Sequence, residues 1–150
     1  MKRNEKFGKI VNSIKVVLPS YSVNEGVARG IVAVFCAQMD PTASELGDIK
    51  CALSEAVTNC IVHAYKDTVG TIYITVRIFE GRLVSVEIRD KGRGIEDVRL
   101  ARQPLYTTDA ENERSGMGFT VMESFCDKVK VVSKCKKGTT VTLYKHLRRR

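Results

Sequence analysis

Residues 54–65, SEAVTNCIVHAY, decide how the rest of the chain is interpreted. The stretch is mostly apolar and contains no Gly or Pro, which indicates a helix. Within it Glu55, Asn59 and His63 recur every four residues, and at about 100° per residue they form a polar stripe opposite an apolar side. From the helix alone, a solvent-facing surface and the wall of a functional cleft explain this stripe equally well. His63 is interpreted as a packed or ligand-orienting histidine, because one imidazole seldom makes a metal site.

The composition predicts one globular domain over residues 1–150. The chain has 150 residues, of which 43% are hydrophobic and 28% charged, enough for an adequate core. The longest uncharged apolar run, GIVAVFCAQM at residues 30–39, is too short to span a bilayer. The five cysteines are odd in number and show no C-x-x-C spacing, which favours a reducing compartment and disfavours zinc. We therefore expect a soluble, cytoplasmic protein with no membrane association.

The net charge of +8 is local. Residues 127–150 hold nine Lys or Arg and one Asp, whereas residues 1–126 hold sixteen residues of each sign. A globally basic surface is therefore excluded. Residues 146–150 are expected to form a frayed, solubilising basic tail, and direct nucleic-acid binding is disfavoured because no aromatic residues alternate with these cations.

Two capping boxes are expected to open the first two helices. Ser22 and Glu25 have the spacing of one box, for a helix reaching to about residue 38. Thr42 and Glu45 repeat that spacing and begin the helix that contains residues 54–65.

Alternating apolar residues predict a strand at 10–18, a hairpin at 71–79 and 83–90, and a second hairpin at 128–133 and 139–145, with a helix at 119–127 before it. The order is β-α-α-β-β-loop-α-β-β. This order implies an α+β sandwich, in which a mixed, mostly antiparallel sheet is covered by helices on one face.

Glycines bracket a long loop at residues 91–114, which we expect to be functional. Gly92 and Gly94 follow Asp90 at a strand end, and Gly116 and Gly118 open a helix whose N-terminus favours phosphate. Each pair taken alone is explained as ordinary turn glycine.

Five segments, taken together, form a pattern that is specific for one protein superfamily. In order and spacing they resemble the N, G1, lid, G2 and final threonine motifs of the GHKL ATPase/kinase superfamily: EAVTNCIVHAY (55–65), RDKGRGI (89–95), ARQPLYTT (101–108), ERSGMGF (113–119) and KGTTV (137–141). More narrowly, the whole chain is similar to the anti-sigma F family of serine-protein kinases, with the anti-sigma B kinases as near relatives. The resemblance implies a Bergerat-type ATP site with residues 91–114 as its lid.

The resemblance also implies a role for each matching residue. It makes Glu55 the catalytic carboxylate, Asn59 the Mg²⁺ ligand and Asp90 the acceptor for the adenine amino group. Backbone at Gly92 and Gly94 would close on the adenine, and Thr139 would support the Asp90 pocket. The implied phosphate-binding segment is Ser115, Gly116, Met117 and Gly118, with Arg114 at the γ-phosphate. Protein partners would dock on the first helix around Arg29.

The implied function is an ATP-dependent anti-sigma factor. It would inhibit a sporulation sigma factor and phosphorylate a serine of an anti-anti-sigma protein, as a homodimer that uses ATP and Mg²⁺. Two alternatives remain: an ATP-binding anti-sigma module without kinase activity, and the related anti-sigma B type of kinase. The ATPase half of a sensor histidine kinase is disfavoured, because no dimerisation helices with a phospho-acceptor His precede the core.

Overall fold

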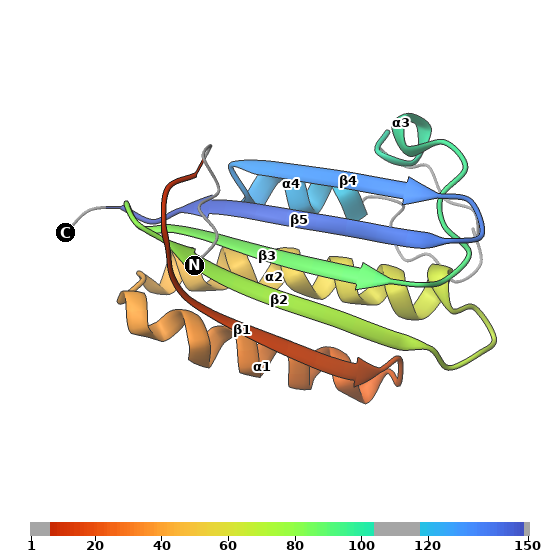
Figure 1. Cartoon of the computed structure of the whole chain (residues 1–150), viewed down its shortest axis with the longest axis horizontal. Coiled ribbons are helices and arrows are strands. Elements are labelled where there is room, and N and C mark those ends of the chain that lie inside the picture. Colours follow the sequence, from red (N-terminus) through yellow and green to blue (C-terminus); the bar gives the residue numbers. More distant parts are fainter. Residues whose placement is uncertain (1–6, 104–117, 149–150) are drawn as a thin grey trace.

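A five-stranded sheet and a layer of helices make up the computed structural model, which describes residues 7–103 and 118–148 (Figure 1). The elements, in chain order, are β1 (Ile10–Pro19), α1 (Val23–Cys36), the 3-10 turn η1 (Ala37–Met39), α2 (Ala43–Asn59), the π-helical turn η2 (Cys60–Ala64), β2 (Thr71–Phe79), β3 (Leu83–Asp90), α3 (Val98–Ala101), α4 (Gly118–Phe125), β4 (Lys128–Lys134) and β5 (Gly138–His146).

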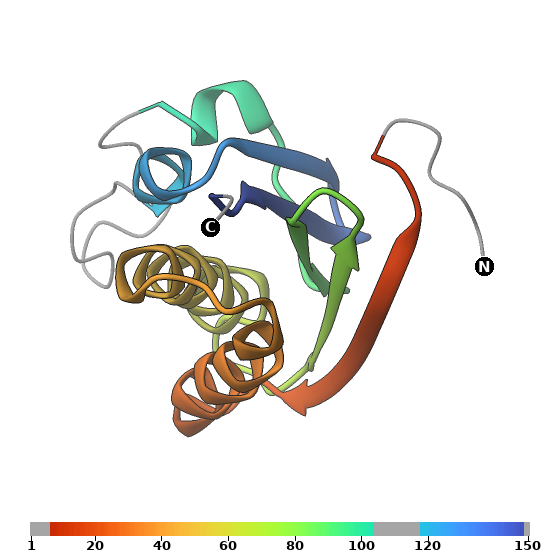
Figure 2. The ribbon, with the colours of Figure 1, turned by 90° about the vertical axis from the view of Figure 1, so that its left-hand side faces the viewer.

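The sheet has the order β1-β2-β3-β5-β4, and every pairing in it is antiparallel. Figure 2 shows α1, α2 and α4 together on one side of this sheet. The expected α+β class and the expected element order are confirmed, but the sheet formed by the described strands is wholly antiparallel and not mixed as expected. After β3 the chain forms α3, α4 and β4, and β5 then lies between β3 and β4 in the sheet. β3 therefore pairs with β5 although the two strands are far apart in the sequence, as with Asp90 opposite Thr139.

The core lies between the sheet and α2. Alternate residues of the central strands are buried toward the helices, because successive strand side chains point to opposite faces. They meet an apolar side of α2 that is almost fully buried. The buried residues are Ile72, Ile74, Val76 and Ile78 of β2, Val84, Val86 and Ile88 of β3, and Leu53, Ala56 and Val57 of α2.

One of the two predicted capping boxes forms. The Thr42 side chain accepts the backbone N–H of Glu45 at 3.0 Å, and the Glu45 carboxylate accepts the N–H of Thr42 at 2.9 Å. The box predicted at Ser22 is wrong, because Ser22 has helical backbone angles and its side chain makes no capping bond. Glu25 instead pairs with Arg29 one turn along α1, at 3.2 Å.

The long loop contains an element that the sequence did not predict. Asp97 caps α3 by accepting the N–H of Leu100 at 3.0 Å. Arg102, directly after α3, donates to the Glu123 carboxylate of α4 at 2.6 and 2.9 Å and to the carbonyl of Val129 at 3.0 Å. The first part of the predicted lid is therefore fastened to α4 and β4.

The basic C-terminal segment is held at its beginning. Leu147 is buried and donates its N–H to the carbonyl of Arg82, while Arg148 donates its N–H to the Glu45 carboxylate at 2.8 Å. The expectation of a frayed tail is therefore wrong for residues 146–148. None of the helices in the described residues is long and apolar enough to cross a membrane.

Candidate functional site

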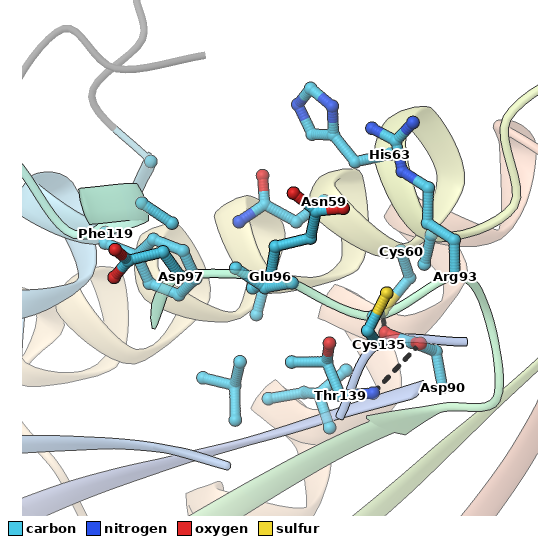
Figure 3. A pocket seen from close by; sticks show the side chains of 18 of the residues that line it. Asn59, Cys60, His63, Asp90, Arg93, Glu96, Asp97, Phe119, Cys135 and Thr139 are labelled. Carbon is cyan, nitrogen blue, oxygen red and sulfur yellow. Dashed lines mark hydrogen bonds between the residues drawn. The ribbon is translucent and has the colours of Figure 1, made fainter. Parts of the chain in front are cut away.

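A cavity of about 510 Å³ lies where the end of α2, the segment after β3, the start of α4 and the β4–β5 turn meet. Its volume is in the range of small-molecule pockets. Apolar side chains supply most of its wall and a few polar groups converge in it (Figure 3). Its lining residues include Ala56, Asn59, Cys60, His63, Asp90, Arg93, Gly94, Ile95, Glu96, Asp97, Leu100, Gly118, Phe119, Cys135, Lys136 and Thr139.

Asp90 is the buried acid of this cavity. Its Oδ1 accepts the backbone N–H of Gly92 at 3.0 Å and that of Thr139 at 3.2 Å. Its Oδ2 faces the Cys60 thiol at 3.6 Å. Burial raises the pKa of the Asp90 carboxyl, and these three donors oppose that rise. Since Oδ1 already has two strong donors, Oδ2 is the oxygen with acceptor capacity left for a ligand amino group.

The Cys60 thiol stays protonated, and it therefore acts as a donor. Burial, followed by the nearby Asp90 charge, raises its pKa well above the ordinary value. Cys60 is buried with the core. It begins the π-helical turn η2, however, and it lines the cavity.

Tyr65 fixes the chain just beyond Asp90. Its hydroxyl accepts the N–H of Lys91 at 2.7 Å and donates to the carbonyl of Thr71 at 2.7 Å. The ring is buried against Gly70, where a Cβ would lie 2.2 Å from a ring carbon. The segment after β3 is therefore tied to the start of β2, which limits how far the Asp90 carboxylate can move.

Gly92 and Gly94 are required by the protein's own backbone. A Cβ on Gly92 would stand 2.3 Å from the carbonyl oxygen of Ala64, and one on Gly94 would stand 2.1 Å from that of Lys134. Gly94 also has a φ of +75°, which side-chain-bearing residues rarely adopt. Both glycines thus let this segment pass between the end of η2 and the β4–β5 turn. Their predicted contact with adenine stays a prediction.

Glu55 and Asn59 converge on the start of α4. A Cβ on Gly118 would lie 3.4 Å from both amide atoms of Asn59 and 3.6 Å from Oε2 of Glu55. Both side chains are half-buried, so the stripe on α2 is a wall of the site and not a solvent face. Asp48, nearer the start of α2, is not part of this wall, because it pairs with Lys145 at 2.9 Å outside the cavity.

Asn59 offers the donor that a magnesium ion would need. Mg²⁺ commonly takes one or two protein oxygens and completes its shell with water and phosphate. The Asn59 amide lines the cavity next to the Glu55 carboxylate, so these residues fit a Mg²⁺–phosphate group. Over residues 7–103 and 118–148, no three His, Cys, Asp or Glu side chains form a metal cluster that could bind such an ion without a phosphate.

Several predicted site residues lie elsewhere. Arg114, Ser115, Gly116 and Met117 fall outside the described residues, and so does most of the second half of the predicted lid. Arg29 is on α1, half-exposed and away from the cavity lining, which is compatible with its predicted role in protein binding. Thr139 does meet Asp90, through its backbone N–H and not through its hydroxyl, which bonds Ser133 at 2.7 Å.

Sequence reasoning missed much of the apolar wall of the cavity. Ile95, Leu100 and Phe119 line it, and Cys135 reaches it from the β4–β5 turn. Phe119 lies on α4, but the other three come from a loop, a single-turn helix and a hairpin turn, where no periodicity marks them. Asp97 could have been found, because an Asp three residues before Leu100 is an N-cap signal.

Sequence comparisons show which known proteins this chain is similar to. Residues 19–145 match the model of the histidine kinase-like ATPase domain. The anti-sigma F factor of Anoxybacillus flavithermus is 55% identical over 137 residues, covering 91% of this chain and 93% of that protein. The anti-sigma F factor of Caldanaerobacter subterraneus is 50% identical, covering 92% of this chain and 96% of that protein.

Solved structures show the same fold at low identity. A Mycobacterium tuberculosis structure of RsbU and RsbW domains superposes with a TM-score of 0.69 at 19% identity, covering 93% of this chain and 34% of that one. A blue-light activated histidine kinase of Erythrobacter litoralis gives a TM-score of 0.56 at 20% identity, covering 81% of this chain and 41% of that one. These likenesses support the fold assignment.

Proposed function

The chain belongs to the histidine kinase-like ATPase family and to the anti-sigma F factors, and on this basis we propose that it is an ATP-dependent anti-sigma factor with serine-kinase activity. It binds a sporulation sigma factor and transfers the γ-phosphoryl group of ATP to a serine of an anti-anti-sigma protein. The observation that carries the proposal is that Asp90 and Asn59 line one cavity of about 510 Å³, and that the Glu55 carboxylate lies with Asn59 against Gly118 at the start of α4.

Asp90 recognises adenine in this proposal. Its Oδ2 accepts the adenine amino group, while the N–H groups of Gly92 and Thr139 keep Oδ1 in place. The apolar wall, which includes Ile88, Ile95 and Val141, covers the base. Guanine presents a carbonyl where adenine has its amino group, and two facing acceptors repel, so the site favours adenine.

Asn59 and Glu55 act at the phosphate end. Asn59 would hold Mg²⁺, which supplies charge neutralisation of the triphosphate when bound. Glu55, one turn earlier on α2, orients the acceptor serine and takes its proton. The segment that contains Ser115, Gly116 and Met117 is proposed to meet the phosphates just before Gly118, with Arg114 at the γ-phosphate. Phosphoryl transfer depends mostly on such positioning and charge stabilisation.

Protein partners are proposed to dock on α1, with the chain acting as a cytoplasmic homodimer. Arg29 is 44% exposed and is oriented by Glu25. Along the same helix Val23, Val27 and Val34 are exposed, and their spacing puts them on one face. At about 100° per residue Arg29 lies well around the helix from these valines, so α1 presents an oriented arginine and a separate apolar face, both of which are typical of protein interfaces.

Substitution of Glu55 and Asn59 tests the kinase assignment. Glu55→Gln keeps the shape but removes the proton acceptor, so we expect radiolabel transfer from ATP to the anti-anti-sigma protein to fall by about 10² or more. ATP and sigma binding should be retained. Asn59→Ala should instead weaken Mg²⁺-dependent ATP binding, and both activities with it.

The same experiment separates the alternative functions. Transfer by Glu55→Gln at the parental rate would disprove the kinase role of this carboxylate and leave the ATP-binding anti-sigma module. Transfer to the acceptor of an anti-sigma B system in preference to that of an anti-sigma F system would instead favour the anti-sigma B type.

A further inference from the structure

The face of the sheet that turns away from the helices is cationic. We call it the outer face, and Figure 2 shows that it is turned away from α1, α2 and α4. The strand register gives its side chains, because they alternate with those buried toward α2. Among the outward positions of the five described strands, Glu87 is the one acid, and it pairs with Arg77 at 3.2 Å. The outward cations are Lys15, Arg77, Arg89, Lys128, Lys130 and Lys134.

Aromatic rings support several of these cations. The Arg89 guanidinium lies 4.7 Å from the centre of the Tyr73 ring, and Lys91 lies 5.1 Å from it. The centre of the Tyr144 ring lies 4.8 Å from the centre of the Phe7 ring and 6.0 Å from Nζ of Lys128. The cations on the outer face are therefore partly ordered before any partner arrives. The protein's own side chains already occupy both tyrosine rings.

One row of side chains crosses the outer face from edge to edge. Val17, Tyr73, Arg89, Thr140 and Val132 are consecutive partners on β1, β2, β3, β5 and β4. Val17 is 60% exposed and Val132 is 55% exposed. Strands lie about 4.8 Å apart, so the row is about 19 Å long. That is the length of a helix of about 13 residues.

We propose that the outer face binds an acidic, amphipathic segment of a partner protein. Carboxylates of the segment meet Arg89, Lys130 and neighbouring cations, and apolar side chains of the segment cover the two exposed valines. This surface lies outside the nucleotide cavity, since none of these residues lines it. The proposal therefore stands independently of the kinase assignment.

Other occupants fit the outer face less well. A second copy of the chain would bring one cationic face against another, which is repulsive. Single-stranded nucleic acid binds by stacking bases on free aromatic faces, and Tyr73 and Tyr144 already hold other side chains. The backbone of a nucleic-acid duplex offers phosphates but nothing apolar for Val17 and Val132.

The expected complex is weak and sensitive to salt. A face of about 19 Å by 20 Å covers about 400 Å², roughly half the area per partner of a standard interface. We expect a dissociation constant on the order of micromolar, and a marked loss of affinity as salt screens the exposed charges.

The test uses the full chain and a fluorescein-labelled 13-residue helical peptide that carries Leu near both ends and Glu between them on the same face. Arg89→Glu with Lys130→Glu should weaken binding at least about tenfold. A control pair with the same change in net charge, Lys50→Glu with Lys137→Glu, lies on α2 and the β4–β5 turn and should change binding less than about threefold. ATP binding and the unfolding temperature of each variant show that the fold is kept.

Neutral substitutions separate a docking surface from general charge attraction. Val17→Ser with Val132→Ser should weaken peptide binding about threefold or more, and so should replacement of the peptide's Leu by Ser. Equal peptide binding by the two charge-reversal pairs would overturn the proposal. It would also be overturned if a 20-nucleotide single strand or a 20-base-pair DNA duplex bound more tightly than the peptide at the same salt concentration and lost binding in the Arg89/Lys130 variant.

Discussion

At the scale of single residues, Asp90 is held in the fold against an electrostatic penalty. Its carboxyl is buried and its pKa is raised, so the folded state disfavours the charged form. A group of this kind stabilises the fold most at low pH. That contribution is lost as pH rises from the ordinary Asp value of 3.8 through the raised pKa. The charge that we propose to recognise adenine is thus one that the isolated protein would fold better without.

Asp90→Asn tests this conflict between stability and binding. ATP affinity should fall about 10-fold to 100-fold, because a hydrogen bond to a charged group contributes about 1.5–3 kcal/mol. The unfolding temperature at pH 7 should stay the same or rise, and this difference from the parent should vanish below about pH 3.8, where both side chains are neutral. A clear loss of stability at pH 7 would contradict the account, as calorimetry can show.

At the scale of elements, exposed ion pairs orient a side chain on α1 and fasten the segment after α3, and such pairs contribute little to global stability. Glu25 orients Arg29 on α1, and Glu123 of α4 holds Arg102 after α3. The main effect of these two ion pairs is to fix the direction of a side chain or a segment. Changes at these pairs should therefore alter binding or local opening more than they alter unfolding.

Arg29→Glu should weaken sigma-factor binding about 30-fold or more, the effect of losing an interface hot spot of about 2 kcal/mol. ATP affinity should not change. The double swap Glu25→Arg with Arg29→Glu restores the ion pair on the helix but moves the cation by one turn. Recovery of sigma binding in the double swap, measured by titration calorimetry, would show that Arg29 serves only α1 stability.

Glu123→Ala should release α3. Because an exposed pair contributes up to about 1 kcal/mol, tryptic cleavage after Arg99 should become up to about fivefold faster. Mg-ATP should slow this cleavage if residues 91–114 close as a lid. Glu80→Ala, in the β2–β3 turn, is the matched control. Identical cleavage rates for the two variants would refute the anchoring role of Arg102.

At the scale of the whole molecule, the C-terminal segment closes the end of the structure opposite the cavity. Leu147 is 4% exposed and the next residue bonds Glu45 at the start of α2. Leu147→Ala should lower the free energy of unfolding by about 2–5 kcal/mol, as measured by urea denaturation. Val132→Ala, at an exposed site, should change it by less than about 0.5 kcal/mol. Equal effects would mean that Leu147 is not part of the core.

Local signals in the sequence predicted the elements well. Strict alternation identified β2 and β3, and the Thr42 box identified the start of α2. The same capping rule failed at Ser22, because the backbone of Ser22 is already helical and its side chain makes no capping bond. A helix of four residues such as α3 is too short for periodicity to reveal.

Long-range features were beyond those signals. The fastening of Arg102 to Glu123 joins residues on separate elements, and the outer face joins Lys15 to Lys130 across five strands. The charge count along the chain shows that the excess of positive charge lies at the C-terminal end. Only the strand register shows which of these C-terminal cations share a surface with cations from the first half of the chain. The site residues that were predicted came from ordered motifs, whose spacing a single chain can show.

The pairing of Asp90 with Thr139 also sets when the site can exist during synthesis. Protein chains leave the ribosome with the N-terminus first, and Asp90 depends on an N–H that follows it by 49 residues. A nascent chain that ends before β5 has β1, β2 and β3 but no floor for the cavity. We therefore expect a chain that ends before β5 to bind no nucleotide at this site.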